Sequence, residues 1–229
     1  MLAKLISWEE FQQAFEFFAY VLNNPPEENF INQLRTQFLG PTPFSSTDGS
    51  HIGRKQISDY FNEHEDTPVH EMVLELAVDW SRLFRGVNSA YGPPPPYEGV
   101  YRAKDGLGVA NVQVVNKAYT NHGLSILEQH RDRSDYLGYE LDFVRYLSEQ
   151  AIHAQEGGQI EEERTYQNDI CEFLGEHLST WISDFCAQAA EHAQTSFYSG
   201  FLLLLQETVA DVTVSLCSMS LSEEWYEKR

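Results

Sequence analysis

The residues of this chain that could most readily carry chemistry are its eight histidines and 35 acidic residues, because together they could bind a metal ion. A di-iron site in a helical bundle requires a glutamate three residues before a histidine, which places both side chains on one helix face. No histidine in this sequence has a glutamate at that position, and neither H-x-x-x-H nor H-E-x-x-H occurs. We therefore expect no metal site and no metal cofactor.

Motifs for nucleotide binding and nucleophilic catalysis are also incomplete. Gly106 and Gly108 form a G-x-G without the third glycine, and the chain contains neither a P-loop nor G-x-S-x-G. The cysteines Cys171, Cys186 and Cys217 are widely spaced, and we interpret them as buried, unpaired residues of a reducing compartment. We expect a protein that is not an enzyme and holds no cofactor. A helical hydrolase or metal oxidase is the rival prediction.

Aromatic residues gather around a proline-rich stretch between residues 79 and 101. Helical spacing puts Trp80, Leu83 and Phe84 on one face, and four consecutive prolines follow at Pro93–Pro96. Because such a run is stiff and extended, it favours a preformed groove that binds a peptide at low entropic cost. Packing of the same residues into a core is the alternative. The candidate peptide-binding residues of this stretch are Trp80, Leu83, Phe84, Pro96, Tyr97, Glu98 and Tyr101.

A second polar stretch runs from Ser134 to Phe143. Ser134 is expected to cap a helix, and Asp135 is expected in its first turn, where the helix dipole favours negative charge. The structural interpretation of Asp135 is capping. The functional interpretation is that Asp135 attracts a cationic group of a partner.

Helices are expected to position both stretches, because helical periodicity covers most of the chain. Ser7 and Glu10 form a capping box, and Val109–Val115, the one β-leaning stretch, is assigned to a helix. The expected helices lie near residues 8–22, 26–38, 57–61, 68–86, 109–122, 134–155, 160–175, 178–192 and 195–217. The pattern predicts an all-α bundle of about nine or ten helices with no substantial sheet.

Two irregular segments, a loop at residues 86–101 and a connector at 124–134, suggest the domain organisation. We expect an N-terminal helical lobe at residues 1–123, a connector at 124–134 and a C-terminal helical lobe at 135–229, forming one compact domain. The N-terminal apolar stretch is too short for a signal peptide, and the longest apolar run, Phe201–Leu205, is far below the ~20 residues of a membrane span. These features predict a cytoplasmic protein without stable membrane insertion.

The net charge of −20 restricts the possible partners. Residues 131–229 are the more acidic part, with 19 acidic and 6 basic residues. Such a surface repels nucleic acid and anionic membranes and attracts a basic partner. The alternative is that the acidity only keeps the protein soluble.

Three motifs in register resemble the TorD/DmsD/NarJ family of redox-enzyme maturation chaperones. The first is W-x-x-L-F-x-G at Trp80–Gly86, followed by a proline-rich turn and Tyr97-Glu-Gly-Val-Tyr101. The second is D-x-x-x-x-E-L-x-F at Asp135–Phe143. The third is H-L-x-x-W at His177–Trp181, with Phe197-Tyr198 after it. The similarity extends over roughly residues 70–205 in order and spacing.

This resemblance implies the helical fold of that family and a chaperone without metal or catalytic turnover. Its members bind the N-terminal signal, often a twin-arginine signal, of a molybdopterin enzyme's catalytic subunit, and delay export until the cofactor is inserted. By position, the signal-binding surface of the family corresponds here to Trp80, Leu83, Phe84, Pro96 and Tyr97. Asp135 corresponds to the acid of an Asp-His pair, and we include Tyr136 in the site.

The chain departs from the family pattern at two positions. Tyr136 replaces the usual histidine and Gly99 the usual serine, so any pH-sensitive role of position 136 is in doubt. The resemblance does not identify the client enzyme, and it permits a monomer or a domain-swapped dimer. The main alternative function is a general all-α interaction module with a different client.

Overall fold

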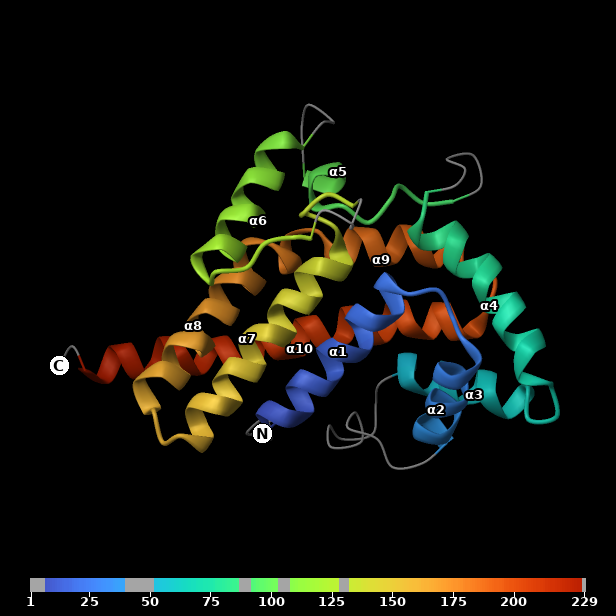
Figure 1. Ribbon diagram of the computed structural model, residues 1–229, viewed down its shortest axis with the longest axis horizontal. Helices are drawn as coiled ribbons and strands as arrows, with labels where there is room; N and C mark the ends of the chain where they lie inside the picture. Colours follow the sequence, from blue (N-terminus) through green and yellow to red (C-terminus); the bar gives the residue numbers. More distant parts are fainter. Residues whose placement is uncertain (1–6, 40–51, 87–91, 103–107, 128–131, 228–229) are drawn as a thin grey trace. The chain divides into compact units, whose positions relative to one another are not determined.

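The computed structural model describes residues 7–39, 52–86, 92–102, 108–127 and 132–227 (Figure 1). Within these ranges the chain forms ten α-helices and a 3-10 turn, η2. The described residues contain no strand, apart from an isolated antiparallel bridge between Tyr97 and Tyr136. The prediction of an all-α fold with nine or ten helices is therefore confirmed.

The helices follow the sequence pattern closely, with one addition. They are α1 (Trp8–Asn23), α2 (Glu28–Leu39), α3 (Ile52–Glu63), α4 (Val69–Phe84), α5 (Glu98–Arg102), α6 (Val109–Asn121), α7 (Leu137–Glu156), α8 (Ile160–Glu176), η2 (Leu178–Thr180), α9 (Ile182–Ala190) and α10 (Ser196–Glu227). The short helix α5 lies where we expected only an extended loop.

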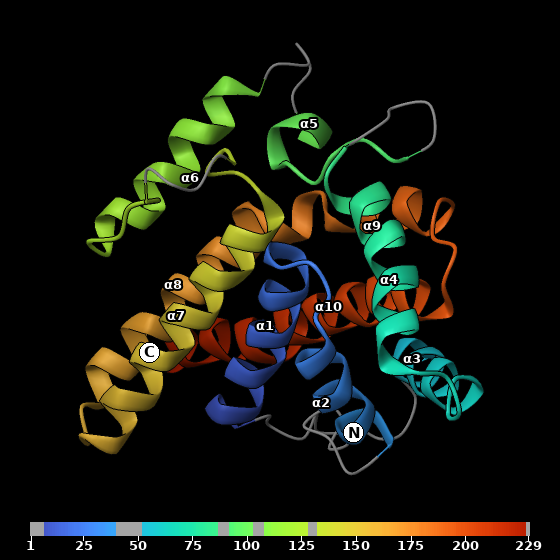
Figure 2. The ribbon, with the colours of Figure 1, turned by 45° about the vertical axis from the view of Figure 1, so that its right-hand side comes forward.

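Local signals account for several helix ends. The capping box before α1 forms as predicted: Ser7 Oγ accepts the Glu10 N–H at 3.2 Å, and Glu10 Oε2 accepts the Ser7 N–H at 3.1 Å. Gly158, at φ +69°, lies in the turn between α7 and α8. This tight turn makes α7 and α8 an antiparallel pair, which both ribbon views show (Figures 1 and 2).

The chain forms two compact units, each built from segments far apart in sequence. Unit 1 comprises Met1–Ala19, Tyr97–Trp181 and Thr208–Arg229, and unit 2 comprises Tyr20–Pro96 and Ile182–Glu207. Unit 1 thus contains α5 to α8, and unit 2 contains α2, α3, α4 and α9. The predicted lobes on either side of residues 124–134 stay a prediction, because residues 128–131 lie outside the described ranges.

Within unit 2, α3 and α10 approach each other through two glycines. A Cβ atom on Gly53 would lie 2.5 Å from the Gly200 carbonyl oxygen, and one on Gly200 would lie 2.6 Å from the Gly53 carbonyl oxygen. In the same unit, the buried Asp79 carboxylate accepts the Thr195 N–H at 2.9 Å and the Thr195 hydroxyl at 2.8 Å, just before α10 begins. Backbone packing and a buried acid therefore set the start of α10.

The cysteines differ in part from expectation. Cys171 on α8 and Cys217 on α10 form a disulfide within unit 1, so the prediction that all three cysteines are unpaired is wrong for these two. Their Cα atoms lie 5.4 Å apart, which is an ordinary separation for a disulfide. Widely spaced cysteines in a sequence do not reveal that two helices bring them together. Cys186 is free and buried, as expected.

One described segment, Ser196–Cys217 of α10, is long and apolar enough to cross a membrane by length and composition. The core helix of a soluble protein meets the same criterion, and 44% of the apolar window is buried inside the protein. The segment is weak evidence for a membrane span.

Candidate functional site

The predicted site residues are divided between the two units. Unit 2 contains Trp80, Leu83, Phe84 and Pro96, and unit 1 contains Tyr97, Glu98, Tyr101, Asp135 and Tyr136. The joint action of the two groups in one peptide-binding site stays a prediction.

The predicted residues of unit 2 are all buried: Trp80, Leu83, Phe84 and Pro96. The Trp80 indole N–H donates to the main-chain oxygen of Val21 at 2.8 Å. The Phe84 ring packs edge-on against Tyr198, with ring centroids 5.5 Å apart. These contacts match the core-packing alternative for this stretch, and a role in peptide binding stays a prediction.

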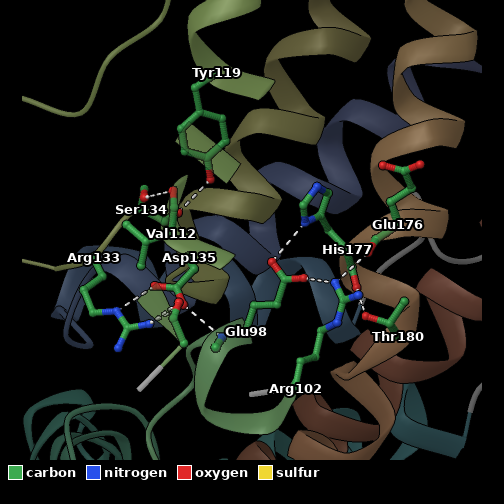
Figure 3. Close-up of polar contacts among 12 residues, drawn as sticks. Glu98, Arg102, Val112, Tyr119, Arg133, Ser134, Asp135, Glu176, His177 and Thr180 are labelled. Carbon is green, nitrogen blue, oxygen red and sulfur yellow. Dashed lines mark hydrogen bonds and ion pairs between the residues drawn. The ribbon is translucent and has the colours of Figure 1, made fainter. Parts of the chain in front are cut away.

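Asp135 in unit 1 is fully buried, and both of its carboxylate oxygens accept hydrogen bonds (Figure 3). Arg133 binds it in a bidentate manner, with Nε 2.9 Å from Oδ1 and Nη2 2.7 Å from Oδ2. The Gly99 N–H also donates to Oδ2, at 2.9 Å. Bidentate pairing with a guanidinium is among the strongest and most directional interactions a carboxylate makes.

Asp135 therefore acts on a different helix from the one we expected. Helix α7 begins at Leu137, so Asp135 lies before it, and its side chain holds the first turn of α5 through Gly99. Its carbonyl oxygen also accepts the Glu98 N–H at 2.9 Å. The predicted cap at Ser134 is wrong as well, because the Ser134 hydroxyl donates to the Val112 carbonyl at 3.1 Å.

Gly99 provides the space in which Arg133 and Asp135 pair. A Cβ atom at this position would lie 2.7 Å from Arg133 Nη2 and 2.9 Å from Asp135 Oδ2. It would also lie 2.8 Å from the Cα atom of Gly108, which itself adopts φ +60°. A side chain at position 99 would force the Arg133 guanidinium to move, since backbone and buried carboxylate surround it.

Glu98 is a second buried carboxylate with a guanidinium partner. Its Oε2 lies 2.9 Å from Nδ1 of the buried His177, and its Oε1 pairs with Nη1 of Arg102. The same Nη1 donates to the Glu176 carbonyl at 2.7 Å (Figure 3). Burial opposes ionisation of Glu98, but hydrogen bonds and charge from His177 and Arg102 outweigh it and lower its pKa.

Glu140 on α7 is a third buried acid. Its surroundings raise its pKa, whereas those of Glu98 lower the pKa of that residue. Among the described residues, neither of its oxygens has a hydrogen-bond partner of good geometry, although Trp181 and Glu98 lie close enough to influence its titration. Burial, followed by the negative charges of Glu98 and Asp135, raises its pKa well above the usual value. These surroundings therefore favour the protonated, neutral form of Glu140.

Two tyrosine rings, Tyr97 and Tyr136, lie next to the Arg133–Asp135 pair. The Tyr97 hydroxyl donates to Asp132 Oδ1 at 2.7 Å, and the Tyr97 and Tyr136 ring centroids lie 5.5 Å apart. The Arg133 guanidinium carbon lies 5.4 Å from the Tyr97 ring centroid, within the range of a cation–π interaction. Tyr136 is buried, so the tyrosine that replaces the family histidine acts here as part of the unit 1 interior.

The remaining predicted residue, Tyr101, lies on α5. Its ring stacks on Trp181 with centroids 5.4 Å apart and an interplanar angle of 29°. It is half-buried, which leaves part of the ring accessible to a partner.

The sequence prediction missed the basic partners of the two carboxylates. Arg102 lies four residues after Glu98 and Arg133 two residues before Asp135, so both were close in sequence to predicted site residues. The i to i+4 spacing of Glu98 and Arg102 is a recognised helical pairing signal. His177 was part of a quoted motif, but its contact with Glu98, 79 residues away, required the tertiary structure.

This arrangement holds two guanidinium groups on two buried carboxylates. The Arg133 and Arg102 side chains are 38% and 35% exposed, whereas Asp135 and Glu98 are fully buried. Across the described ranges, no group of three His, Cys, Asp or Glu side chains could hold a metal ion. Both buried carboxylates thus already bind planar, cationic groups, those of Arg102 and Arg133.

Comparison with known proteins gives consistent results. Residues 53–187 match the family model of the nitrate reductase delta subunit. The chain is 31% identical over 133 residues to chaperone protein TorD of Vibrio vulnificus, covering 58% of this chain and 60% of that protein. It is 28% identical over 126 residues to TorD of Vibrio cholerae, covering 55% of each chain. For TorD of Vibrio parahaemolyticus, identity is 25% over 164 residues, covering 71% of this chain and 69% of the relative.

Proposed function

We propose that this chain, which belongs to the nitrate reductase delta subunit family, is a cytoplasmic maturation chaperone. Its predicted resemblance to TorD-type chaperones is confirmed by the identity with TorD proteins. Its client is the catalytic subunit of a molybdopterin-dependent oxidoreductase. The chaperone binds the N-terminal signal of that subunit, assists cofactor insertion and delays export. The matched segment spans about 60% of the first relative, so the activity and the partner remain part of this proposal.

The observation that carries the proposal is the paired arrangement of Asp135 and Glu98. Each is a buried carboxylate bound to an arginine whose side chain reaches the surface. A twin-arginine signal presents two guanidinium groups of the same chemistry. We infer that arginines of the client compete with Arg133 and Arg102 for these carboxylates.

The apolar part of the signal would contact aromatic side chains. In unit 1, Tyr97 and Tyr101 are half-buried, and Tyr97 lies against the Arg133 guanidinium. Trp80, Leu83, Phe84 and Pro96 in unit 2 are retained as predicted contacts. Because these four are buried, binding through them requires local opening of unit 2.

Replacement of Arg133 tests this proposal more directly than replacement of Asp135. Removing the Asp135 carboxylate would also remove the bonds it accepts from Gly99 and Arg133, so a loss of affinity would not separate a lost contact from a disturbed start of α5. Arg133→Gln leaves the carboxylate in place and removes its internal competitor. Because it leaves a buried carboxylate without its cation, we also expect it to lower the folding stability by about 3–5 kcal/mol. We expect this variant to bind a synthetic twin-arginine signal peptide at least about tenfold more tightly in calorimetry, a gain of about 1.4 kcal/mol.

Arg145→Gln is the matched control. This substitution also removes one positive charge from unit 1. Arg145, however, pairs with the more exposed carboxylates of Asp142 and Glu149. A gain in affinity equal in both variants would attribute the effect to net charge and contradict the proposal. A peptide with both arginines replaced by alanine should bind poorly. Equal binding of that peptide would favour the alternative, a general interaction module.

A further inference from the structure

A cavity of about 220 Å³ lies in unit 1, and none of the predicted site residues lines it. One of its lining residues is His177, which contacts Glu98. Helices α6, α7 and α8 contribute to its wall. The largely buried rings of Phe143 and Phe173 line it, and Asp169, Glu172 and Glu176 supply carboxylates. Of these, Asp169 Oδ2 lies 3.5 Å from Nε2 of His122, which also lines the cavity. Such a combination of ring faces and acids suits a side chain with an apolar stem and a cationic tip.

The charge of α8 near this cavity is unfavourable for the helix by itself. Glu172 and Glu176 lie near its C-terminal end, and its last turn contains no basic residue. The C-terminal end of a helix carries partial negative charge, so carboxylates there repel the helix dipole. A bound cation would relieve this repulsion. Lys117 on α6 is the one lysine or arginine among the described residues that line the cavity.

A buried histidine, His177, forms another part of the wall. His177 is 5% exposed, and its Nδ1 is committed to Glu98. The His177 ring stacks on Phe173, with centroids 4.6 Å apart and an interplanar angle of 30°, so both rings have fixed orientations.

The chain also shows how a guanidinium binds at this end of α8. Arg102 donates to the main-chain oxygen of Glu176 while pairing with Glu98 (Figure 3). The last turn of α8 is therefore already a site of guanidinium recognition on one side. The cavity adds further carboxylates and the edge of the largely buried Phe173 ring at the same turn.

We propose that this cavity binds an arginine side chain of a polypeptide client. The guanidinium lies between the carboxylates of Asp169 and Glu172 and against the Phe173 ring, and the methylene groups contact Phe143. A planar guanidinium fits better than the ammonium of lysine, because it can stack and bind carboxylates in two directions at once. The assignment of this arginine to the client's N-terminal signal rests on the proposed function.

The first experiment uses N-acetyl-arginine amide as the probe, with the full chain. We expect saturable shifts of the His122 and His177 ring signals in NMR, and weaker shifts with N-acetyl-lysine amide. The double variant Asp169→Asn, Glu172→Gln should weaken binding of the arginine probe about tenfold, the loss expected when charge-assisted hydrogen bonds are removed.

The matched control is Glu161→Gln, Glu162→Gln, which removes the same charge from the first turn of α8, away from the cavity. Its affinity for the arginine probe should stay within about twofold of the unchanged protein. Equal weakening of both double variants, or unchanged affinity of the cavity variant at an unchanged Tm, would overturn the proposal.

A second experiment separates this inference from the proposed function. A synthetic twin-arginine signal peptide is titrated into the unchanged protein and into the cavity variant. If the peptide binds the unchanged protein tightly and the variant Asp169→Asn, Glu172→Gln weakly, both the cavity proposal and the proposed function are supported. If it binds both proteins tightly, the cavity proposal is overturned and the proposed function stands. If the peptide binds no better than N-acetyl-arginine amide, the amide result still supports the cavity, while the proposed function fails.

Discussion

At the scale of single residues, three buried carboxylates of unit 1 differ in their neighbours. Asp135 and Glu98 each have a guanidinium partner, and for Glu98 the partners lower the pKa. Glu140 lies near the other two acids without such a partner of its own. The raised pKa of Glu140 favours its neutral form, which avoids an unpaired buried charge.

Glu140→Gln is expected to stabilise the protein increasingly as the pH rises. The folded protein holds the Glu140 proton above pH 4.5, where the unfolded chain releases it, because the pKa of Glu140 is raised in the fold. Unfolding then releases a proton, so higher pH favours the unfolded state of the unchanged protein. Glutamine removes this dependence. The difference in unfolding free energy should grow by up to about 1.4 kcal/mol per pH unit.

Thermal or denaturant unfolding of both proteins between about pH 5 and pH 8 measures this difference. Asp142→Asn is a suitable control, because Asp142 lies on the same helix with a half-exposed side chain. A stability difference for Glu140→Gln that stays constant over this pH range would show that Glu140 is ionised in the fold.

At the scale of helices, backbone contact decides how α3 and α10 pack in unit 2. The Cβ positions of Gly53 and Gly200 would each fall within 2.6 Å of the other helix's carbonyl oxygen. Helix packing of this kind leaves no room for a methyl group, because the neighbouring atoms belong to the backbone and cannot rotate away.

Gly53→Ala is therefore expected to lower the free energy of unfolding by roughly 1–3 kcal/mol, the usual effect of overpacking. Gly175→Ala on α8 is the matched control, since no atom lies within 4 Å of its Cβ position. That control should stabilise the protein by up to about 1 kcal/mol through helix propensity. Chemical denaturation measures both. Equal effects of the two substitutions would mean that α3 and α10 are not in close contact.

At the scale of the whole molecule, the charge of −20 should attract a cationic signal over some distance. Raising the salt from about 0.1 M to 1 M shortens the Debye length from about 10 Å to 3 Å. We expect the association rate of a twin-arginine peptide to fall at least about tenfold over this range, measured by stopped-flow fluorescence. An association rate that ignores salt would indicate that the acidic surface serves solubility alone.

The helical architecture could be read from the sequence by itself. Apolar residues at three- and four-residue spacing, the Ser7–Glu10 capping box and the Gly157-Gly158 break are local signals, and the helices they predict are present. The family resemblance also rested on motifs that the chain carries in order. Local patterns suffice for these features because each helix depends mainly on residues within a few positions.

Only the tertiary structure decided which side chains meet. The Gly99–Asp135 bond spans 36 residues, the Glu98–His177 bond spans 79, and the Cys171–Cys217 disulfide spans 46. Helix α5 was missed for the same reason, since its first N–H groups are satisfied by Asp135 from another segment. Sequence periodicity shows which face of a helix is buried, but the partner across that face depends on how the helices pack.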